Sequence, residues 1–312
     1  KPHADVYIDD KALNAYGDLE KGTGIYPSAG SLPPRHFHRL TGGSSVHTYR
    51  KEGGDLSGEI FYYRHMPPEL RPMFPAMTNA HAGGRDWFEM EKVQGVTASS
   101  LYLSQEMTTE QLSRLLSALQ RIHATPSTAS GAGGMCAGVM YANYAAKLEA
   151  RYKSHDYSVF DGAQDVYQTL LWQLRGYEEE DRGSLTVIHG DPVLTNVLIT
   201  SKQEMKFIDM RGRVGDALTI LGDQMYDWAK VYQSLIGYDQ IMQGAQVQQE
   251  YAACMLDAFE QFVCRELSPR ALQDLRLLTK SLLFSLLPLH ADQPDKCQRY
   301  YRLLNTSPSL QI

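Results

Sequence analysis

Alternating hydrophobic and polar residues predict strands in the first third of the chain. Alternation on both sides of residues 41–45 predicts a hairpin over residues 37–51, because the small residues in between favour a turn. Residues 59–64 have the pattern of a short helix that stops before two prolines. Residues 86–93 alternate again and predict a further strand, with a turn at Gly95 after it.

Helical spacing dominates the rest of the chain. Thr108 and Gln111 are spaced as in a capping box, so a helix should begin there and end near His123. Its apolar residues share one face, namely Leu112, Leu115, Leu116, Leu119 and Ile122. The pattern then predicts, in order, a loop over 124–134, helices over 141–153 and 163–177, strands over 185–188, 197–199 and 206–208, and mainly helix over 222–304. Strands followed by helices around a small hairpin indicate an α+β fold in two parts.

The composition is that of an ordinary globular protein. The chain has 312 residues, 43% of them hydrophobic and 21% charged, which suits one large domain or two lobes that share a cleft. The formal net charge is −6. A mildly acidic chain is a poor general binder of nucleic acid, because phosphate binding needs clustered lysines and arginines. We therefore expect no nucleic-acid partner.

The sequence also predicts no membrane partner. The longest apolar run, residues 277–289, is interrupted by Lys280 and Pro288 and is too short to span a bilayer. No signal peptide opens the sequence. Four cysteines at positions 136, 254, 264 and 297 form no C-x-x-C pair, and we interpret them as reduced thiols. These features predict a cytoplasmic protein.

The most informative segment is Val-Ile-His-Gly-Asp-Pro-Val-Leu-Thr-Asn over residues 187–196, followed by Phe-Ile-Asp at 207–209. Asp191 follows an apolar strand and a glycine, so it should lie in a tight loop. Asn196 should open the next strand and Asp209 close its hairpin partner, so both side chains should lie beside each other and across the loop from Asp191. Phosphoryl transfer needs a metal ion and a carboxylate that orients the attacking hydroxyl. Magnesium prefers such oxygen donors.

His-Gly-Asp-x-x-x-x-Asn followed by two apolar residues and an Asp resembles the catalytic loop and metal site of the aminoglycoside phosphotransferase and choline kinase superfamily, which is related to protein kinases. The resemblance implies that Asp191 is the catalytic base and that His189 braces the loop. It further implies that Asn196 and Asp209 are magnesium ligands.

The same resemblance implies a protein-kinase-like, two-lobed α+β fold. A small β-rich N-lobe over residues 35–94 would bind the nucleotide, and a mainly helical C-lobe over 95–312 would bind the acceptor. The implied cofactors are ATP, with GTP as an alternative, and Mg²⁺. The implied partner is a small-molecule hydroxyl acceptor such as a sugar or an amino alcohol.

Two other functions are alternatives. Met-Arg-Gly follows Asp209 where protein kinases have Phe-Gly, and no activation segment is evident, so a protein kinase is the weaker alternative. A nucleotide-binding scaffold without catalysis is the stronger one, because the upper lobe could be degenerate. Turnover of ATP with a panel of metabolites would distinguish a kinase from a scaffold.

Residues 222–230 also resemble the superfamily, where an Asp on the helix after the metal site supports the catalytic loop. Asp227 is the candidate here, and the alternative is a carboxylate stabilised by the helix dipole. Arg211 and Arg213 could bind a phosphate or an anionic substrate, since guanidinium groups pair well with such anions. They could equally be exposed loop charges.

The candidate phosphate-covering loop contains Gly42, Gly43, Ser44 and Ser45. Small residues there would let backbone N–H groups approach phosphate oxygens. The loop resembles that of the superfamily, in which serines are more frequent and glycines fewer than in protein kinases. A plain hairpin turn is the alternative.

A kinase-like site also needs a cation on the following strand, held by a helix carboxylate. Lys51 and Glu59 are the candidates, with Arg50 as a rival cation and exposed surface charge as the alternative. The segment around Glu89 and Glu91 resembles the hinge between the lobes, where main-chain groups would pair with adenine. An ordinary strand is the alternative.

The beginning of the chain does not resemble a kinase lobe. Residues 1–12, Lys-Pro-His-Ala-Asp-Val-Tyr-Ile-Asp-Asp-Lys-Ala, resemble the closing motifs of haloacid-dehalogenase-like phosphatases. No nucleophilic Asp-x-Asp strand precedes them, so this piece cannot be a working phosphatase. Residues 1–34 would then be an extension that keeps a remnant of a fused phosphatase-like domain, as part of a longer fusion. A surface Asp-Asp turn is the alternative.

Overall fold

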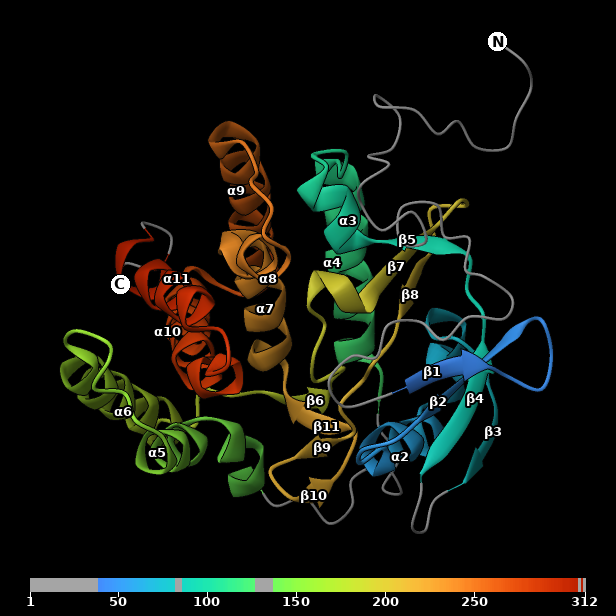
Figure 1. Ribbon diagram of the computed structural model, residues 1–312, viewed down its shortest axis with the longest axis horizontal. Helices are drawn as coiled ribbons and strands as arrows, with labels where there is room; N and C mark the ends of the chain where they lie inside the picture. Colours follow the sequence, from blue (N-terminus) through green and yellow to red (C-terminus); the bar gives the residue numbers. More distant parts are fainter. Residues whose placement is uncertain (1–38, 82–85, 127–136, 308–309, 311–312) are drawn as a thin grey trace.

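The computed structural model describes residues 39–81, 86–126, 137–307 and 310. A small antiparallel sheet with one helix beside it forms the first lobe, and a larger, mainly helical body forms the second (Figure 1). This arrangement confirms the predicted α+β fold. The predictions for residues 1–34, including the phosphatase-like motif, and for Cys136 lie outside the described residues.

The first lobe is a four-stranded sheet in the order β1-β2-β4-β3, and all its neighbouring strands are antiparallel. Its strands are β1 (Arg39–Gly42), β2 (Thr48–Glu52), β3 (Met77–His81) and β4 (Trp87–Glu91). Helix α2 (Ser57–His65) packs on the sheet through a small apolar cluster of Leu56, Ile60, Phe88 and Met90. The predicted hairpin, short helix and strand are confirmed, whereas β3 was not predicted.

The second lobe begins directly after the short link 92–94. Strand β5 (Gly95–Thr97) pairs with β7 (Val197–Thr200), which pairs with β8 (Met205–Phe207). The predicted turn at Gly95 is therefore wrong, because Gly95 opens a strand. A Cβ at Gly95 would lie 2.8 Å from the Ile199 carbonyl oxygen, so the glycine permits the close approach of the two strands.

A pair of helices follows β5. Helix α3 (Ala98–Leu103) is short, and α4 (Thr109–Ala124) carries the predicted capping box. The Gln111 N–H donates to Thr108 Oγ1 over 3.1 Å, and the Thr108 N–H donates to Gln111 Oε1 over 3.0 Å. All five predicted apolar residues of α4 are buried, so this helix is confirmed.

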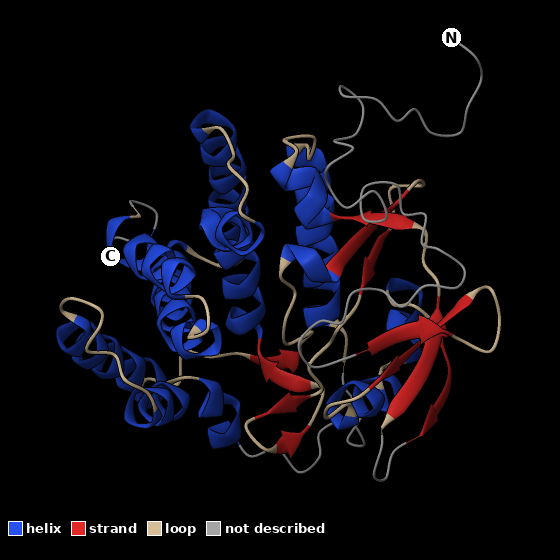
Figure 2. Ribbon diagram, in the orientation of Figure 1, coloured by secondary structure: helices blue, strands red, loops and turns tan. Residues whose placement is uncertain are grey.

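Helices supply most of the remaining chain (Figure 2). The elements before the catalytic segment are η3 (Ala137–Asn143), α5 (Ala145–Ser154), α6 (Ala163–Glu179) and β6 (Leu185–Val187). Those after it are β9 (Arg213–Val214), β10 (Ala217–Leu218), β11 (Leu221–Asp223), α7 (Gln224–Gln233), η5 (Ser234–Tyr238), α8 (Asp239–Gln243), α9 (Gln249–Glu266), α10 (Pro269–Leu286), η6 (Leu287–His290) and α11 (Pro294–Thr306). The predicted helical region is confirmed.

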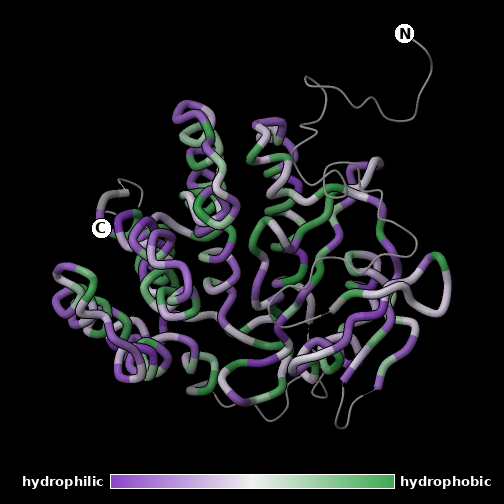
Figure 3. The backbone as a smooth tube through the Cα atoms, viewed as in Figure 1, coloured by the Kyte–Doolittle hydropathy of each residue, from purple (hydrophilic) through white to green (hydrophobic). Residues whose placement is uncertain are grey.

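Apolar residues of these helices form the main core. Hydrophobic stretches alternate with hydrophilic ones along most helices (Figure 3), as expected for helices that bury one face. Helix α10 is buried along most of its length. No helix in the described part of the chain is both long and apolar enough to cross a membrane. Of the cysteines in that part, Cys254, Cys264 and Cys297 are free thiols.

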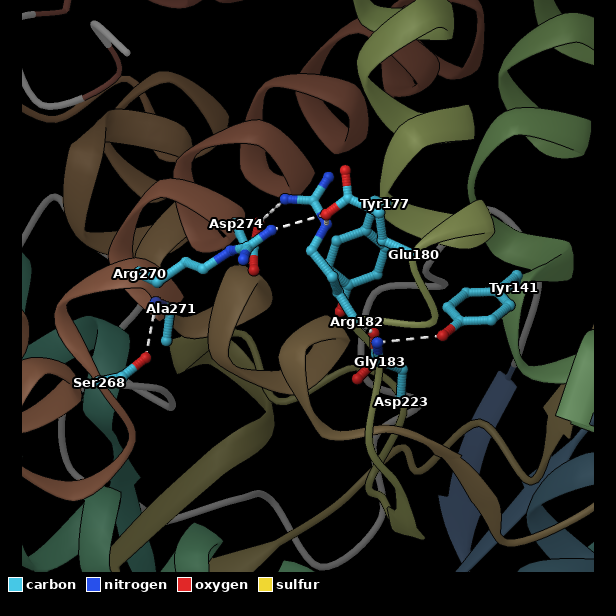
Figure 4. A network of polar contacts seen from close by, with 10 residues as sticks. All are labelled: Tyr141, Tyr177, Glu180, Arg182, Gly183, Asp223, Ser268, Arg270, Ala271 and Asp274. Atoms are coloured by element: carbon cyan, nitrogen blue, oxygen red, sulfur yellow. Dashed lines mark hydrogen bonds and ion pairs between the residues drawn. The ribbon is translucent and has the colours of Figure 1, made fainter.

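Asp223, which lies near Gly183 and Tyr177 in Figure 4, fixes the beginning of α7. Asp223 Oδ1 accepts from the Met225 N–H over 3.1 Å and from the Ser184 N–H over 3.0 Å, so it caps α7 and ties it to the β6 segment. Its other oxygen accepts from the Tyr144 and Tyr177 hydroxyls over 2.8 and 2.6 Å. Helix α7 therefore starts from a rigid point, which matters because it carries several polar residues of the candidate site.

Candidate active site

The loop after β6 is held by one buried carboxylate. Asp227 on α7 accepts from the backbone N–H groups of His189 and Gly190 over 2.7 and 2.8 Å. His123 Nε2 lies 3.0 Å from the same carboxylate. Two backbone donors on one buried carboxylate fix the path of the loop. The sequence prediction for Asp227 thus has the geometry that loop support requires.

His189 connects this loop to the next hairpin. Its Nδ1 accepts from the Asp191 N–H over 3.1 Å, so its Nε2 carries the proton and donates to the Ile208 carbonyl over 3.0 Å. Burial lowers the pKa of His189, against the pull of Asp227 and other carboxylates, which favours this neutral form. His189 therefore has the contacts that a brace of this loop requires, and it is placed to orient Asp191.

Asp191 is a partly exposed member of the loop. Its side chain is 41% exposed, and one carboxylate oxygen lies 3.0 Å from Lys230 Nζ. Burial raises the pKa of Asp191, but Lys230 and Arg211 outweigh it, and the pKa is lowered. Asp191 is therefore ionised at neutral pH and can accept a hydrogen bond from a hydroxyl group.

Asn196 contacts the backbone of Asp191, and the residue before Asp209 contacts the backbone of Asn196. The Asn196 Nδ2 donates to the Asp191 carbonyl over 2.9 Å, and the Ile208 N–H donates to the Asn196 carbonyl over 3.0 Å. Asn196 ends the short helix η4 (Leu194–Asn196) and does not open β7, which begins one residue later. Asp209 follows β8 by two residues and has a φ of 61°. Such a conformation is rare outside glycine and is frequent at functional sites.

Lys51 joins the two lobes at this point. Its Nζ lies 2.6 Å from Glu59 Oε1 and 2.9 Å from Asp209 Oδ1. Burial lowers the pKa of Lys51, but Asp209 and Glu59 outweigh it, and the pKa is raised. Arg50 points to the other side of β2, where its guanidinium lies 3.8 Å from the centre of the Trp87 ring. Of the two candidate cations, Lys51 therefore lies against Glu59 and Asp209, and Arg50 does not.

The β1–β2 loop contains the predicted glycines and serines. Gly43, Ser45 and His47 use their N–H groups within the loop, on Thr48 O, Thr48 Oγ1 and Ser45 Oγ. Phosphate binding by these groups would require them to exchange partners, so it stays a prediction. A Cβ at Gly43 would lie 2.3 Å from Thr48 Oγ1, so glycine is required for this turn.

The prediction for Glu89 needs a correction. β4 is a central strand, and Glu89 pairs with Arg50 of β2 on one side and with Asn79 of β3 on the other. Its main chain therefore cannot pair with adenine. Its buried carboxylate instead accepts from Ser44 Oγ over 2.6 Å and ties the β1–β2 loop to the sheet. Glu91 ends β4 directly before the link 92–94 and keeps its place beside the junction of the lobes.

Arg211 and Arg213 contact different parts of the molecule. Arg213 donates to Ser57 Oγ over 2.7 Å and lies 2.8 Å from Asp55 Oδ2, so it contacts the segment that opens α2 and not a phosphate position. Arg211 donates through Nη1 to the Tyr226 hydroxyl over 2.9 Å, on the side of α7 and not at the β1–β2 loop. That Arg211 binds a phosphate or an anionic substrate stays a prediction.

Three polar residues of the site were not predicted, namely Lys147, Tyr226 and Lys230. Lys147 Nζ lies 3.5 Å from the Tyr226 hydroxyl. Burial raises the pKa of Tyr226, but Lys147, Arg211 and Lys230 outweigh it and lower the pKa to about 7. Tyr226 and Lys230 are one helical turn apart and flank Asp227, so helical spacing could have indicated them. Lys147 lies far away in the sequence and carries no such signal.

The donors suit a particular kind of metal ion. Within the described residues, no group of three or more His, Cys, Asp and Glu side chains could enclose a metal. Asp209 offers a carboxylate, and Asn196 keeps its side-chain carbonyl while its amide nitrogen binds Asp191. Magnesium often takes one or two protein ligands and completes its shell with phosphate oxygens and water. The pair therefore fits magnesium that binds with a nucleotide and does not fit a zinc-type cage.

Solved structures with related folds come from two groups of kinases. The chain is similar to a choline/ethanolamine kinase family protein from Mesorhizobium loti, at 13% identity and a TM-score of 0.61, with 92% of this chain and 90% of that chain covered. It is also similar to a thermostable mutant of aminoglycoside phosphotransferase APH(4)-Ia, at 15% identity and a TM-score of 0.62, with 92% of this chain and 96% of that chain covered. A third similar structure is the GDP and kanamycin complex of APH(2")-IIia, at 16% identity and a TM-score of 0.61, with 88% of this chain and 91% of that chain covered. These similarities confirm the predicted protein-kinase-like, two-lobed fold.

Sequence comparison identifies the family. No curated protein matches the sequence. The model of APH, described as a phosphotransferase enzyme family, matches residues 63–262, which is more than half of the 312 residues. The matched span runs from α2 into α9 and includes the loop of Asp191, Asp209 and Asp227. The chain therefore belongs to the APH family of phosphotransferase enzymes.

Proposed function

We propose that the protein is a magnesium- and ATP-dependent kinase that transfers the γ-phosphoryl group to a hydroxyl of a small metabolite. The observation that carries this proposal is that His189 ties the loop of Asp191 to the backbone just before Asp209, while Lys51 of the other lobe contacts Asp209. The family assignment supports it. So do the fold neighbours, which include complexes with GDP and kanamycin and with AMP-PNP and hygromycin B.

Asp191 would act on the acceptor. Its ionised carboxylate would accept a hydrogen bond from the acceptor hydroxyl and take its proton as the new O–P bond forms and the bond from γ-phosphorus to the bridging oxygen breaks, releasing ADP. Lys230, 3.0 Å from Asp191, would keep the carboxylate charged until the acceptor arrives. The neutral His189 would fix its orientation through the Asp191 N–H.

The other residues would bind and orient the nucleotide. Asn196 and Asp209 would hold magnesium, which when bound neutralises phosphate charge and positions the γ-phosphoryl group. Lys51 would bind phosphate oxygens. Its ion pair with Glu59 would keep it in place, and its contact with Asp209 puts it beside a proposed magnesium ligand. Main-chain groups of the link 92–94, directly after Glu91, would receive the base. ATP is the first nucleotide to test, and GTP is the alternative.

The proposal is tested by ATP consumption with a panel of sugars, amino alcohols and aminoglycosides, with and without EDTA. Asp191→Asn should lower kcat by about 100-fold or more, because general-base catalysis is lost. Its affinity for nucleotide should stay close to that of the unchanged protein. Asp257→Asn, on the exposed side of α9, is the matched control and should keep full turnover.

A nucleotide-binding scaffold would give a different result. It would bind ATP in calorimetry but consume none with any acceptor, and Asp191→Asn would change nothing that can be measured. Full turnover by Asp191→Asn with a working acceptor would also contradict the assignment of the base.

A further inference from the structure

The side of Asp191 that faces α7 is strongly cationic. Three cations surround the ring of Tyr226: Lys147 of α5, Arg211 after β8 and Lys230 of α7. The Nζ atoms of Lys147 and Lys230 lie 5.8 and 5.9 Å from the ring centre, and Cζ of Arg211 lies 6.0 Å from it. We call these four residues the basic cluster.

The basic cluster has fewer anions than cations. Asp191 is paired with Lys230, but neither Lys147 nor Arg211 forms an ion pair with a carboxylate in the part of the chain that the structure describes. Both instead contact the Tyr226 hydroxyl. Cations buried without matching carboxylates are costly, so such a group is unusual unless an anion completes it.

From this geometry we propose that the acceptor carries an anionic group, carboxylate or phosphate, and that Lys147 and Arg211 bind this group while Asp191 receives the hydroxyl to be phosphorylated. The proposal rests on the proposed kinase function and specifies its substrate class. A cationic acceptor would be repelled by the same residues.

Two observations favour the acceptor over the nucleotide as the source of the anion, and a third shows that the cluster is accessible. Lys51, the cation of the nucleotide side, contacts Asp209 and Glu59 and belongs to the first lobe. The basic cluster belongs to the second lobe, and Figure 1 shows α5 separated from β1–β4 by β9, β10 and β11. Lys147, Arg211 and Lys230 are half-buried and Asp191 is partly exposed, so an anion can reach the cluster.

The pKa shift of Lys147 supports an anion site at the basic cluster. Burial lowers the pKa of Lys147, Tyr226 raises it, and repulsion from Arg211 and Lys230 lowers it further, so that the net direction is down. An anion placed between these groups would reverse that repulsion. The guanidinium of Arg211 could bind carboxylate or phosphate through two parallel hydrogen bonds.

A binding experiment tests the site without any knowledge of the acceptor. Inorganic phosphate is titrated into the full chain in a calorimeter. The unchanged protein should bind it saturably, and Lys147→Met and Arg211→Met should each weaken binding by about 10-fold, as expected for loss of a charged hydrogen bond. Lys51→Met should keep this binding, and Lys147→Arg should restore most of it.

Lys153→Met is the matched control for charge. Lys153 lies on the same helix as Lys147, but its side chain is 70% exposed and pairs with Glu149. Its loss should leave phosphate binding unchanged. The proposal is overturned if the unchanged protein shows no saturable binding, if Lys51→Met removes all of it, or if Lys153→Met weakens it as much as Lys147→Met. Unchanged melting temperatures of the variants separate lost binding from lost folding.

A matched series of acceptors then tests the substrate class. D-Glucuronate, glucose 6-phosphate, D-glucose and D-glucosamine share a ring and differ in charge, and the first two distinguish carboxylate from phosphate. Phosphoryl transfer should favour an anionic member by about 10-fold or more in kcat/KM, and Lys147→Met should remove that preference. Transfer that favours D-glucosamine would overturn the anionic class while the kinase function stands. Phosphate binding without ATP consumption under any condition would leave the anion site and reject the kinase.

Discussion

Asp227 shows how one side chain can carry the shape of an active-site loop. It is fully buried and accepts two backbone hydrogen bonds from His189 and Gly190. Gly190 has a φ of 87°, and a Cβ there would lie 2.6 Å from Cβ of Arg211. The loop therefore depends on a glycine for its turn and on a carboxylate for its position.

Asp227→Asn should destabilise the protein and the site together. An amide in place of the carboxylate presents an N–H group to one of two backbone donors, and one buried donor loses its partner. We expect a loss of about 2–3 kcal/mol in the free energy of unfolding and a clear fall in kcat. Urea unfolding and steady-state kinetics measure both, with the exposed Asp257→Asn as the control. An unchanged unfolding midpoint would show that the loop has another support.

Tyr226 should titrate near neutral pH. Its pKa of about 7 lies below the ordinary value of 10.0, so the folded protein releases this proton at a lower pH than the unfolded chain. Stability should therefore rise with pH between about 7 and 10 relative to Tyr226→Phe. An absorbance titration should show tyrosinate formation near pH 7 that Tyr226→Phe lacks. The absence of this step would contradict the cationic surroundings.

At the scale of elements, the capping box of α4 gives a local test. Thr108 and Gln111 exchange hydrogen bonds at the start of this helix. Thr108→Ala should lower the free energy of unfolding by about 1 kcal/mol, because one N–H group of the first turn loses its acceptor. Thr109→Ala, one residue on and also exposed, should change it much less. Equal losses would mean that the capping box adds nothing to stability.

Elements with strong local patterns could be predicted from the sequence, and those fixed by distant partners could not. The β1–β2 hairpin and α4 were predicted because turn residues and one-sided apolar spacing are local signals. β5 was missed because it is three residues long and is a strand only through its pairing with β7, about a hundred residues away. The main chain of Glu89 was misassigned because its neighbour β3 was not predicted.

The same limit applies to the candidate site. Asp191, Asn196 and Asp209 lie within one segment, so their spacing in the sequence was enough to predict that they belong to one site. Lys147 joins the basic cluster only through a side-chain contact with Tyr226, which is far away in the sequence, and no short-range pattern indicates that contact. The residues proposed to bind the acceptor could therefore be identified only from the structure.

At the scale of the whole molecule, two glycines bring the lobes into direct contact. A Cβ at Gly58 of α2 would lie 2.2 Å from the Arg211 carbonyl oxygen, and one at Gly212 would lie 1.8 Å from the Gly58 carbonyl oxygen. Gly212 also has a φ of 60°. The first turn of α2, which carries Glu59, therefore rests on the backbone just after Asp209.

Gly58→Ala should displace α2 and with it the Glu59–Lys51 pair. Because small displacements of catalytic groups are costly, we expect kcat/KM for ATP to fall by about 10- to 100-fold. Gly176→Ala is the matched control, since a Cβ there meets nothing within 4 Å, and alanine should favour α6 by about 0.5–1 kcal/mol. Kinetics of both variants provide the measurement. Equal kinetics for both would show that the cleft tolerates movement of α2.

The contact between Gly58 and Gly212 also limits how the small lobe can move. The chain crosses between the lobes at residues 92–94, and the glycines touch at a second place. Two fixed points define an axis, so rocking about the line between them is the motion that breaks neither. Such a pivot would change the gap between the β1–β2 loop and Asp209 more than it changes the position of α2. Opening to admit a nucleotide would then keep the Glu59–Lys51 pair together within the small lobe and separate Lys51 from Asp209.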